Sequence, residues 1–146
     1  MILTIVIILT FLFMEFVAWF MHKYVMHGFA WELHRDHHKR DGNDSFLEMN
    51  DFFFVFFAAL SMIAFSIWSY ASSSVALGVG IGISIYGLVY TFIHEIFIHQ
   101  RVKVLSRTKS KYLLGLRRAH KIHHKHLGKH EGECFGMLWI PLKYFK

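Results

Sequence analysis

The chain alternates between long apolar stretches and polar stretches that are rich in histidine. The apolar stretches cover residues 2–20, 52–70 and 75–93, and Glu15 is the only charged residue in them. At about 1.5 Å of rise per residue, each stretch would span roughly 28 Å as a helix, close to the thickness of about 30 Å of the hydrocarbon layer of a membrane. The pattern therefore predicts three transmembrane helices.

The segments between and after these stretches complete the predicted topology. Residues 71–74 are short and polar, so the second and third helices should form a hairpin. The first stretch lacks the basic region and the small-residue cleavage site of a secretory signal, so we interpret it as a true span. Residues 135–145 are apolar but too short to cross, and Trp139 and Pro141 suit a short re-entrant or interfacial segment.

The distribution of basic residues predicts the orientation of the helices. All 16 Lys and Arg residues lie in residues 21–51 and 94–146, and none lies before the first stretch or in residues 71–74. Basic residues favour the cytoplasmic side, so we expect the N-terminus outside and the histidine-rich regions, 21–51 and 94–134, at the cytoplasmic face of a bacterial inner membrane. This bias explains the net charge of +6 without a nucleic-acid partner.

Length and composition favour a single membrane-bound domain over residues 1–146. The chain is 55% hydrophobic, which is more than a soluble domain of this size could bury. Its one cysteine, Cys134, excludes a disulfide or a cysteine-ligated cluster within the chain. We therefore expect an all-α integral membrane fold, with cytoplasmic helices and the C-terminal segment surrounding a histidine site.

Ten of the 12 histidines fall into four ordered boxes, in which HxxxxH alternates with HxxHH. An even number of spans, two, separates the second box from the third, so all four boxes emerge at one face of the membrane and can form one site. Ten imidazoles exceed the four to six ligands that saturate a common metal, so we expect two ions. The candidate ligands are His22, His27, His34, His37, His38, His94, His99, His120, His123 and His124.

The two kinds of box differ in geometry. The three histidines of HxxHH share one face of a helix, so their side chains can converge. Those of HxxxxH point about 140° apart on a straight α-helix, so either they bind different metals or the helix is distorted, which Gly28 makes plausible in the first box. Imidazole binds Fe, Zn, Cu and Ni, so the ligand type does not identify the metal.

Three carboxylates could support these ligands from behind. Glu15 shares a helical face with His22, so it could accept a hydrogen bond from a ligating histidine or join two helices. Asp36 and Glu95 lie inside boxes and could act in the same way or simply be solvated.

Two further patterns concern local structure. Asn50 or Asp51 is expected to cap the helix that begins at residue 52. Leu113, Leu116 and His120 share a face, which predicts an amphipathic helix that packs onto the site and could also line the substrate path.

The four boxes in this order resemble the fatty acid hydroxylase superfamily. The run from His22 to Gly28 and the pair Asn50-Asp51 are similar to those of bacterial β-carotene 3-hydroxylases. The resemblance implies that two iron ions, bound by the ten box histidines, use O2 as co-substrate, and zinc could replace iron in purified protein. It also implies hydroxylation of β-carotene at the 3 and 3′ positions, to zeaxanthin via β-cryptoxanthin. His126 and His130 lie outside the pattern.

Other functions remain open at this point. The same site could act on another lipid, as a carotenoid ketolase or as a fatty acyl or sterol hydroxylase or desaturase. A metal transporter or haem carrier is disfavoured, because no histidine lies deep within a span.

An oxygenase of this kind needs electrons, and the chain has neither an iron–sulfur motif nor a dinucleotide-binding fingerprint. We therefore expect an external donor, ferredoxin with its NAD(P)H reductase, at the basic face. Those basic residues could instead only set topology and contact membrane lipid.

Overall fold

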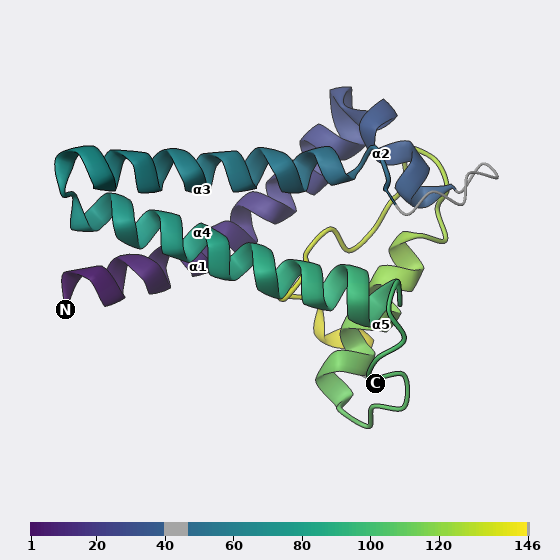
Figure 1. Cartoon of the computed structure of the whole chain (residues 1–146). Helices are drawn as coiled ribbons and strands as arrows, with labels where there is room; N and C mark the ends of the chain where they lie inside the picture. The colour runs from purple at the N-terminus through teal and green to yellow at the C-terminus, as the bar shows by residue number, and fades with distance from the viewer. Residues whose placement is uncertain (40–46, 146) are drawn as a thin grey trace.

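The computed structural model describes residues 1–39 and 47–145, and every regular element in these ranges is helical. The elements follow one another along the chain as shown in Figure 1. They are α1 (Ile2–Phe20), η1 (Met21–Phe29), α2 (Trp31–His38), α3 (Asp51–Ala71), α4 (Ser74–Thr91), η2 (Phe92–Ile98), α5 (Lys111–His123) and η3 (Leu142–Phe145).

Three of the helices are long and apolar enough to cross a membrane, namely Ile2–Phe29, Asp51–Ala71 and Ser74–Ile98. The predicted all-α membrane architecture is therefore confirmed. Helix α4 packs against both α1 and α3. The N-terminus and the α3–α4 connection lie at one end of the bundle, whereas α2 and α5 lie at the other end (Figure 1).

Glycines on α4 allow α1 to approach closely. A Cβ atom added at Gly78 would lie 2.7 Å from Val6 Cγ1, and one at Gly82 would lie 2.6 Å from Thr10 Cβ. These separations are shorter than van der Waals contact, so larger side chains would push the two helices apart. The four-residue spacing of Gly78 and Gly82 therefore gives a close contact between α1 and α4.

Helices α3 and α4 are joined by a tight turn and by hydrogen bonds. Ser72 ends α3 with a left-handed conformation (φ 52°), and the Ser73 hydroxyl caps α4 by accepting from the amide of Ala76. Deeper in the bundle, Ser61 Oγ donates to the carbonyl of Gly80 at 2.9 Å. This bond satisfies the hydrogen-bonding requirement of the buried Ser61 hydroxyl inside the bundle.

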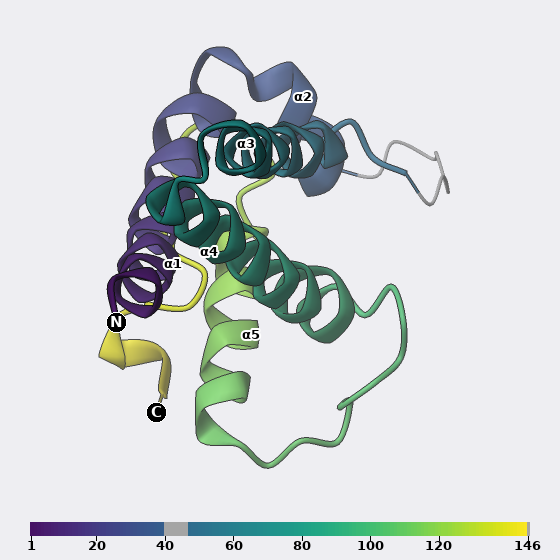
Figure 2. The same cartoon turned by 60° about the vertical axis from the view of Figure 1, so that its left-hand side comes forward.

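Helices α1 and α4 both continue as π-helix beyond their last α-helical residue, into η1 and η2. In Figure 2 the continuation of α1 leads towards α2, and α5 lies beside α4. The amide of His99 donates to the carbonyl of His94 at 2.9 Å, an i→i+5 bond. Because a π-helical turn closes over five residues, positions i and i+5 come back to the same side. The distorted-helix alternative for the HxxxxH boxes is therefore correct, and Gly28 (φ −108°, ψ −125°) breaks the first π-helix.

The cap that we expected on α3 is different in the structure. Asn50 occupies the N-cap position, but its side chain makes no capping hydrogen bond. Its Oδ1 instead accepts from His34 Nδ1 at 2.7 Å. Asp51 reaches backwards and accepts from the amide of Glu48 at 3.0 Å. The prediction of a side-chain cap from Asn50 is wrong because a histidine competes for the same oxygen.

Helix α5 is amphipathic, as predicted. The Ser110 hydroxyl caps its start, and its buried face includes Leu116, Ala119 and His120. The C-terminal segment folds back against this helix, where Arg118 donates to the carbonyl of Tyr144 at 2.8 Å. Residues of η2, α5 and the C-terminal segment thus form a buried apolar cluster.

Candidate metal centre

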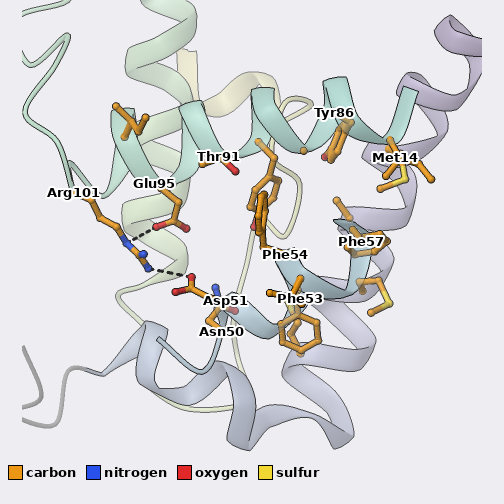
Figure 3. A pocket seen from close by; sticks show the side chains of 18 of the residues that line it. Met14, Asn50, Asp51, Phe53, Phe54, Phe57, Tyr86, Thr91, Glu95 and Arg101 are labelled. Atoms are coloured by element: carbon orange, nitrogen blue, oxygen red, sulfur yellow. Dashed lines mark hydrogen bonds and ion pairs between the residues drawn. The ribbon is translucent and has the colours of Figure 1, made fainter. Parts of the chain in front are cut away.

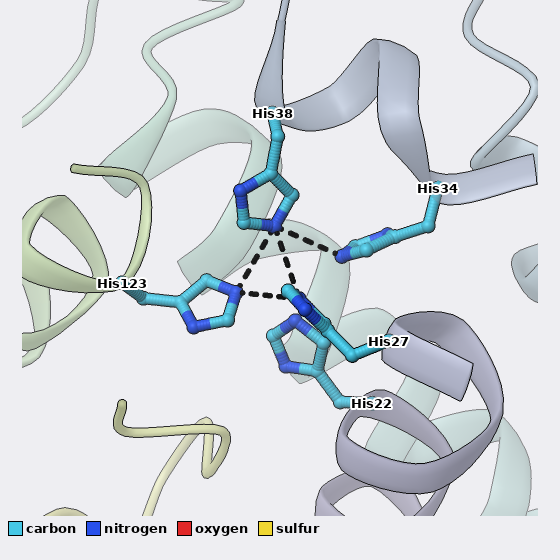
Figure 4. A group of neighbouring side chains, drawn as sticks. All are labelled: His22, His27, His34, His38 and His123. Carbon is cyan, nitrogen blue, oxygen red and sulfur yellow. Dashed lines mark hydrogen bonds between the residues drawn. The ribbon is translucent and has the colours of Figure 1, made fainter. Parts of the chain in front are cut away.

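Five histidines from three elements converge on one point in Figure 4. They form the five-histidine cluster, which consists of His22 and His27 from η1, His34 and His38 from α2, and His123 from α5. The Nε2 atom of His38 lies 3.2 Å from that of His27, 3.2 Å from that of His34 and 3.1 Å from that of His123.

Four more histidines form a second group beside the first. This four-histidine cluster consists of His37 from α2, His94 from η2, His99 directly after it, and His120 from α5. The Nε2 atoms of His37 and His94 are 3.1 Å apart, and those of His99 and His120 are 2.9 Å apart.

Each HxxHH box divides between the two clusters. His34 and His38 join one cluster while His37 joins the other, and His120 and His123 separate in the same way. His124 belongs to neither group, but its ring stacks on that of His38 with centroids 4.4 Å apart and lies 4.5 Å from that of His120. Its Nε2 is buried without a hydrogen-bond partner. His124 therefore lies between the clusters, where it could bind either ion.

The Nε2 atoms of the five-histidine cluster carry lone pairs. Each of its five histidines uses Nδ1 for a hydrogen bond to oxygen, with partners Phe135 O, Lys129 O, Asn50 Oδ1, His126 O and Glu133 O. A neutral imidazole has one proton, and here it must lie on Nδ1 because a carbonyl oxygen only accepts. The converging nitrogens therefore cannot hydrogen-bond one another, and the lone pairs repel unless a cation lies between them.

The spacing of these nitrogens suits a metal ion. Imidazole nitrogens bind zinc and similar dications at about 2.0–2.1 Å, which places neighbouring ligand atoms about 3.0–3.4 Å apart. The observed separations of 3.1 and 3.2 Å agree with this geometry. His22 Nε2, which is buried without a partner, is available as a further ligand.

Burial also holds the histidines neutral, the state in which they bind metals. Loss of hydration lowers the pKa of His34 to about 2, that of His38 to about 4 and that of His123 to about 3. The same cause lowers the pKa of His37 and His120 well below the ordinary value. Repulsion between neighbouring histidines, if they were protonated, acts in the same direction and contributes to these lowered pKa values.

Carboxylates stand behind the four-histidine cluster. His37 Nδ1 donates to Glu48 Oε2 at 2.8 Å, and His94 Nδ1 donates to Glu95 Oε1. Arg101 lies between the two acids, with its guanidinium 2.7 Å from Glu95 and 3.1 Å from Glu48. Glu95 thus lies where its predicted supporting role requires, and that role stays a prediction.

The other two predicted supporting carboxylates contact no histidine in the described part of the chain. Glu15 Oε1 accepts from the backbone amides of residues 137, 138 and 139, and its Oε2 accepts from the Tyr86 hydroxyl. Asp36 accepts from the amide of Met49 at 2.6 Å. The alternative that Glu15 joins two helices is confirmed by its bond to Tyr86 of α4. Asp36 uses Oδ2 for the amide, and its Oδ1 is buried without a hydrogen-bond partner among the described residues. A supporting role of Asp36 towards a histidine stays a prediction.

Several hydrogen-bond partners of the cluster histidines were not predicted from the sequence. Glu48 could have been suspected as an acid directly before an apolar span on the histidine-bearing side. The backbone carbonyls of residues 126–135 carry no signal in the sequence, since every residue has one. His126 supports the site only through such a carbonyl, and the side chains of His126 and His130 lie outside both clusters.

A mainly apolar cavity of about 450 Å³ lies between α1, α3 and α4 beside the clusters. Met14, Phe57 and Tyr86 line one end, and Asn50, Asp51, Glu95 and Arg101 line the other (Figure 3). Asn50 and Glu95 are also the hydrogen-bond partners of His34 and His94. Asn50 and Glu95 therefore lie between the polar end of the cavity and a histidine of each cluster.

Several known proteins have sequences similar to that of this chain. A beta-carotene hydroxylase of Pantoea ananas is 36% identical, over 93% of this chain and 76% of its own length. One from Paracoccus sp. (strain PC1) is 33% identical, over 93% of this chain and 83% of its own. A chloroplastic beta-carotene 3-hydroxylase of an Oncidium hybrid is 33% identical, over 85% of this chain but 40% of its own.

No solved structure matches the chain. The model of the fatty acid hydroxylase family matches residues 7–142, which include all four histidine boxes. The chain therefore belongs to the fatty acid hydroxylase family.

Proposed function

We propose that this protein is a membrane-bound oxygenase that hydroxylates β-carotene at the 3 and 3′ ring positions, giving zeaxanthin via β-cryptoxanthin. The observation that carries the proposal is the pair of adjacent histidine clusters, with lone pairs turned inward, beside an apolar cavity that reaches into the membrane-spanning bundle. The relatives named beta-carotene hydroxylase support the choice of substrate.

The two clusters would hold two iron ions, with His124 available to either. When bound, the metal pair supplies the activation of O2 that attack on an unactivated C–H bond requires and that no side chain offers. The net reaction consumes O2, two electrons and two protons, and yields the alcohol and water. Zinc could occupy the same nitrogens in purified protein, since it binds imidazole tightly.

The protein's own contribution is to orient the ligands and the substrate. For seven of the ten box histidines, an acceptor at Nδ1 fixes the rotation and tautomer of the ring, so that Nε2 would face the metal. Met14, Phe53 and Phe57 offer an apolar wall for the ring end of the carotenoid. The polar cluster of Asp51, Glu95 and Arg101 closes the cavity and would set how far the ring enters.

The topology is part of the proposal. Helices α2 and α5, which carry histidines of both clusters, lie at the end of the bundle opposite the N-terminus and the α3–α4 turn (Figure 1). Along the sequence, all Lys and Arg residues lie in residues 21–51 and 94–146, the two regions that contain the histidine boxes. We infer that this end is cytoplasmic in a bacterial inner membrane. A periplasm-active reporter fused at Ser73 should be active and one at Gly128 silent, and the reverse pattern would overturn the orientation.

The electron donor is proposed to be ferredoxin, reduced by its NAD(P)H reductase. The cytoplasmic end carries exposed basic residues that would attract an acidic carrier. Turnover by the purified protein in lipid with NADPH and no added carrier would contradict this part of the proposal.

Expression in a bacterium that makes β-carotene tests the function directly. The proposal predicts new β-cryptoxanthin and zeaxanthin, and a matched His38→Ala variant should leave β-carotene unchanged. Echinenone or canthaxanthin would instead identify a ketolase, and unchanged β-carotene with altered fatty acids or sterols would identify another lipid hydroxylase or desaturase.

A further inference from the structure

The two histidine clusters differ in the charge of the groups behind them. In the five-histidine cluster, every Nδ1 donates to a neutral oxygen, four of which are backbone carbonyls and one of which is the amide of Asn50. In the four-histidine cluster, the Nδ1 atoms of His37 and His94 donate to the carboxylates of Glu48 and Glu95. The five-histidine cluster has more ligands, whereas the four-histidine cluster has charged support.

A single guanidinium fixes both carboxylates. Arg101 contacts Glu95 at 2.7 Å, Glu48 at 3.1 Å and Asp51 at 3.5 Å. The side chains of Arg101, Glu48 and Glu95 are 12%, 12% and 15% exposed, so water screens them little. Among the described residues, Arg101 thus ties three carboxylates together beside the four-histidine cluster.

This charge has a direct effect on a bound metal. A histidine that donates to a carboxylate has a more basic Nε2 than one that donates to a carbonyl, because the carboxylate draws the Nδ1 proton and leaves electron density on the ring. The charge also attracts a dication through a medium of low polarity.

We propose that Glu48 and Glu95, held in place by Arg101, are positioning residues that selectively strengthen metal binding at the four-histidine cluster. The two metal sites are therefore chemically unequal. One has five histidines whose Nδ1 atoms donate to neutral oxygens, and the other has four histidines, two of which donate to carboxylates. This inference rests on the proposed two-metal centre but adds a distinction between its halves.

The test is metal titration of the metal-free protein in detergent, with Co²⁺ as a coloured probe and a competing chelator to measure affinity. His34→Ala disables the five-histidine cluster, so the remaining ion reports on the four-histidine cluster. His99→Ala does the reverse. Neither substitution removes a histidine that contacts Glu48 or Glu95 in the bonds described above.

Glu48→Gln and Glu95→Gln are then added to each background. In the His34→Ala protein, each should weaken Co²⁺ binding by about 10–100-fold. In the His99→Ala protein, each should change binding by less than about twofold, since neutral groups support that cluster. Glu32→Gln serves as the matched control, because it removes an exposed carboxylate from α2 and should affect neither background.

Equal losses in both backgrounds, or no loss in either, would overturn the inference. If a Gln variant fails to fold by circular dichroism, the corresponding Asp variant keeps the charge at a longer distance, and it should show a smaller loss that is again confined to the His34→Ala background. Failure of the unsubstituted protein to bind two ions would count against the proposed function itself. If it binds two ions but the Gln variants affect both clusters alike, only this inference is contradicted.

Discussion

The membrane-spanning bundle and the histidine-bearing end are built by different kinds of contact. In the bundle, helices are specified by local apolar runs and meet through small residues such as Gly78 and Gly82. At the histidine-bearing end, several ring nitrogens are fixed by partners far away in the sequence, as with His22 and Phe135 or His27 and Lys129. The bundle is thus readable from short windows of sequence, whereas the metal centre depends on the whole chain being folded.

The largest expected effect comes from removing a ligand. Replacing any of the ten box histidines with alanine, for example His38→Ala, should reduce turnover below detection, because the cluster loses an inward-facing nitrogen. His126→Ala and His130→Ala should be mild, since His126 supports the site through its backbone carbonyl, which alanine keeps. Pigment analysis in a β-carotene background measures both, and full activity after loss of two box histidines would refute the ten-ligand site.

The next effect tests the contact that joins the two regions. Glu15, inside the bundle, accepts from three consecutive amides of residues 137–139, and the neighbouring Phe135 carbonyl accepts from His22. Glu15→Ala should therefore loosen this segment, lower activity by about tenfold or more and weaken metal retention. Glu15→Gln keeps an acceptor oxygen but loses the charge-assisted bonds, so it should fall between Glu15→Ala and the parent protein.

Equal metal retention by Glu15→Ala and the parent protein would show that the bundle and the centre are independent. Circular dichroism of both variants separates a loosened segment from general unfolding.

A third prediction concerns packing within the bundle alone. Gly82→Ala places a Cβ against Thr10 and should destabilise the protein by about 1–3 kcal/mol. Gly87→Ala is the matched control on the same helix, because a Cβ there meets nothing within 4 Å. It should be neutral or stabilising, by up to about 1 kcal/mol, because alanine is the better helix former. Thermal unfolding in detergent measures both, and equal effects would contradict the close α1–α4 contact.

A fourth prediction concerns pH and the metal-free centre. The pKa of His34, His38 and His123 is about 2, 4 and 3 in the folded protein, against about 6.5 when unfolded. Between these values the unfolded chain binds more protons, so stability should fall as pH drops from about 6.5 towards 4, by up to about 1.4 kcal/mol per pH unit for each histidine. The melting temperature of metal-free protein at pH 7.5 and 5 tests this, and a higher value at pH 5 would contradict neutral burial.

The smallest expected effect concerns the donor surface. If ferredoxin docks on the basic residues, turnover with ferredoxin and its reductase should fall by a few-fold as ionic strength rises, because salt screens the attraction. If turnover does not depend on ionic strength, the requirement for a carrier would still stand, but docking on the basic residues would be contradicted.

The sequence predicted the parts of the fold that depend on local pattern. The three spans, the amphipathic α5 and the gathering of the boxes at one end followed from apolar runs, a repeated spacing and the even number of spans. The sequence could not decide how HxxxxH brings its histidines together, because the spacing alone does not distinguish the π-helices η1 and η2 from α-helix.

The partners behind the histidines were harder to predict for a physical reason. Backbone carbonyls carry no residue-specific signal, so the support from Lys129, Glu133 and Phe135 was invisible. Glu15 was noticed because a carboxylate in a span needs a partner, but its partners are Tyr86 and the backbone of a segment more than a hundred residues away.

Metal content is the most direct test of the central claim. Protein purified under anaerobic conditions and loaded with Fe²⁺ should retain about two ions per chain. His34→Ala and His99→Ala should each retain about one, because each disables a different cluster. A single ion in the unsubstituted protein, or loss of both ions in each variant while the helical content is unchanged, would contradict two separate histidine clusters acting as a metal pair.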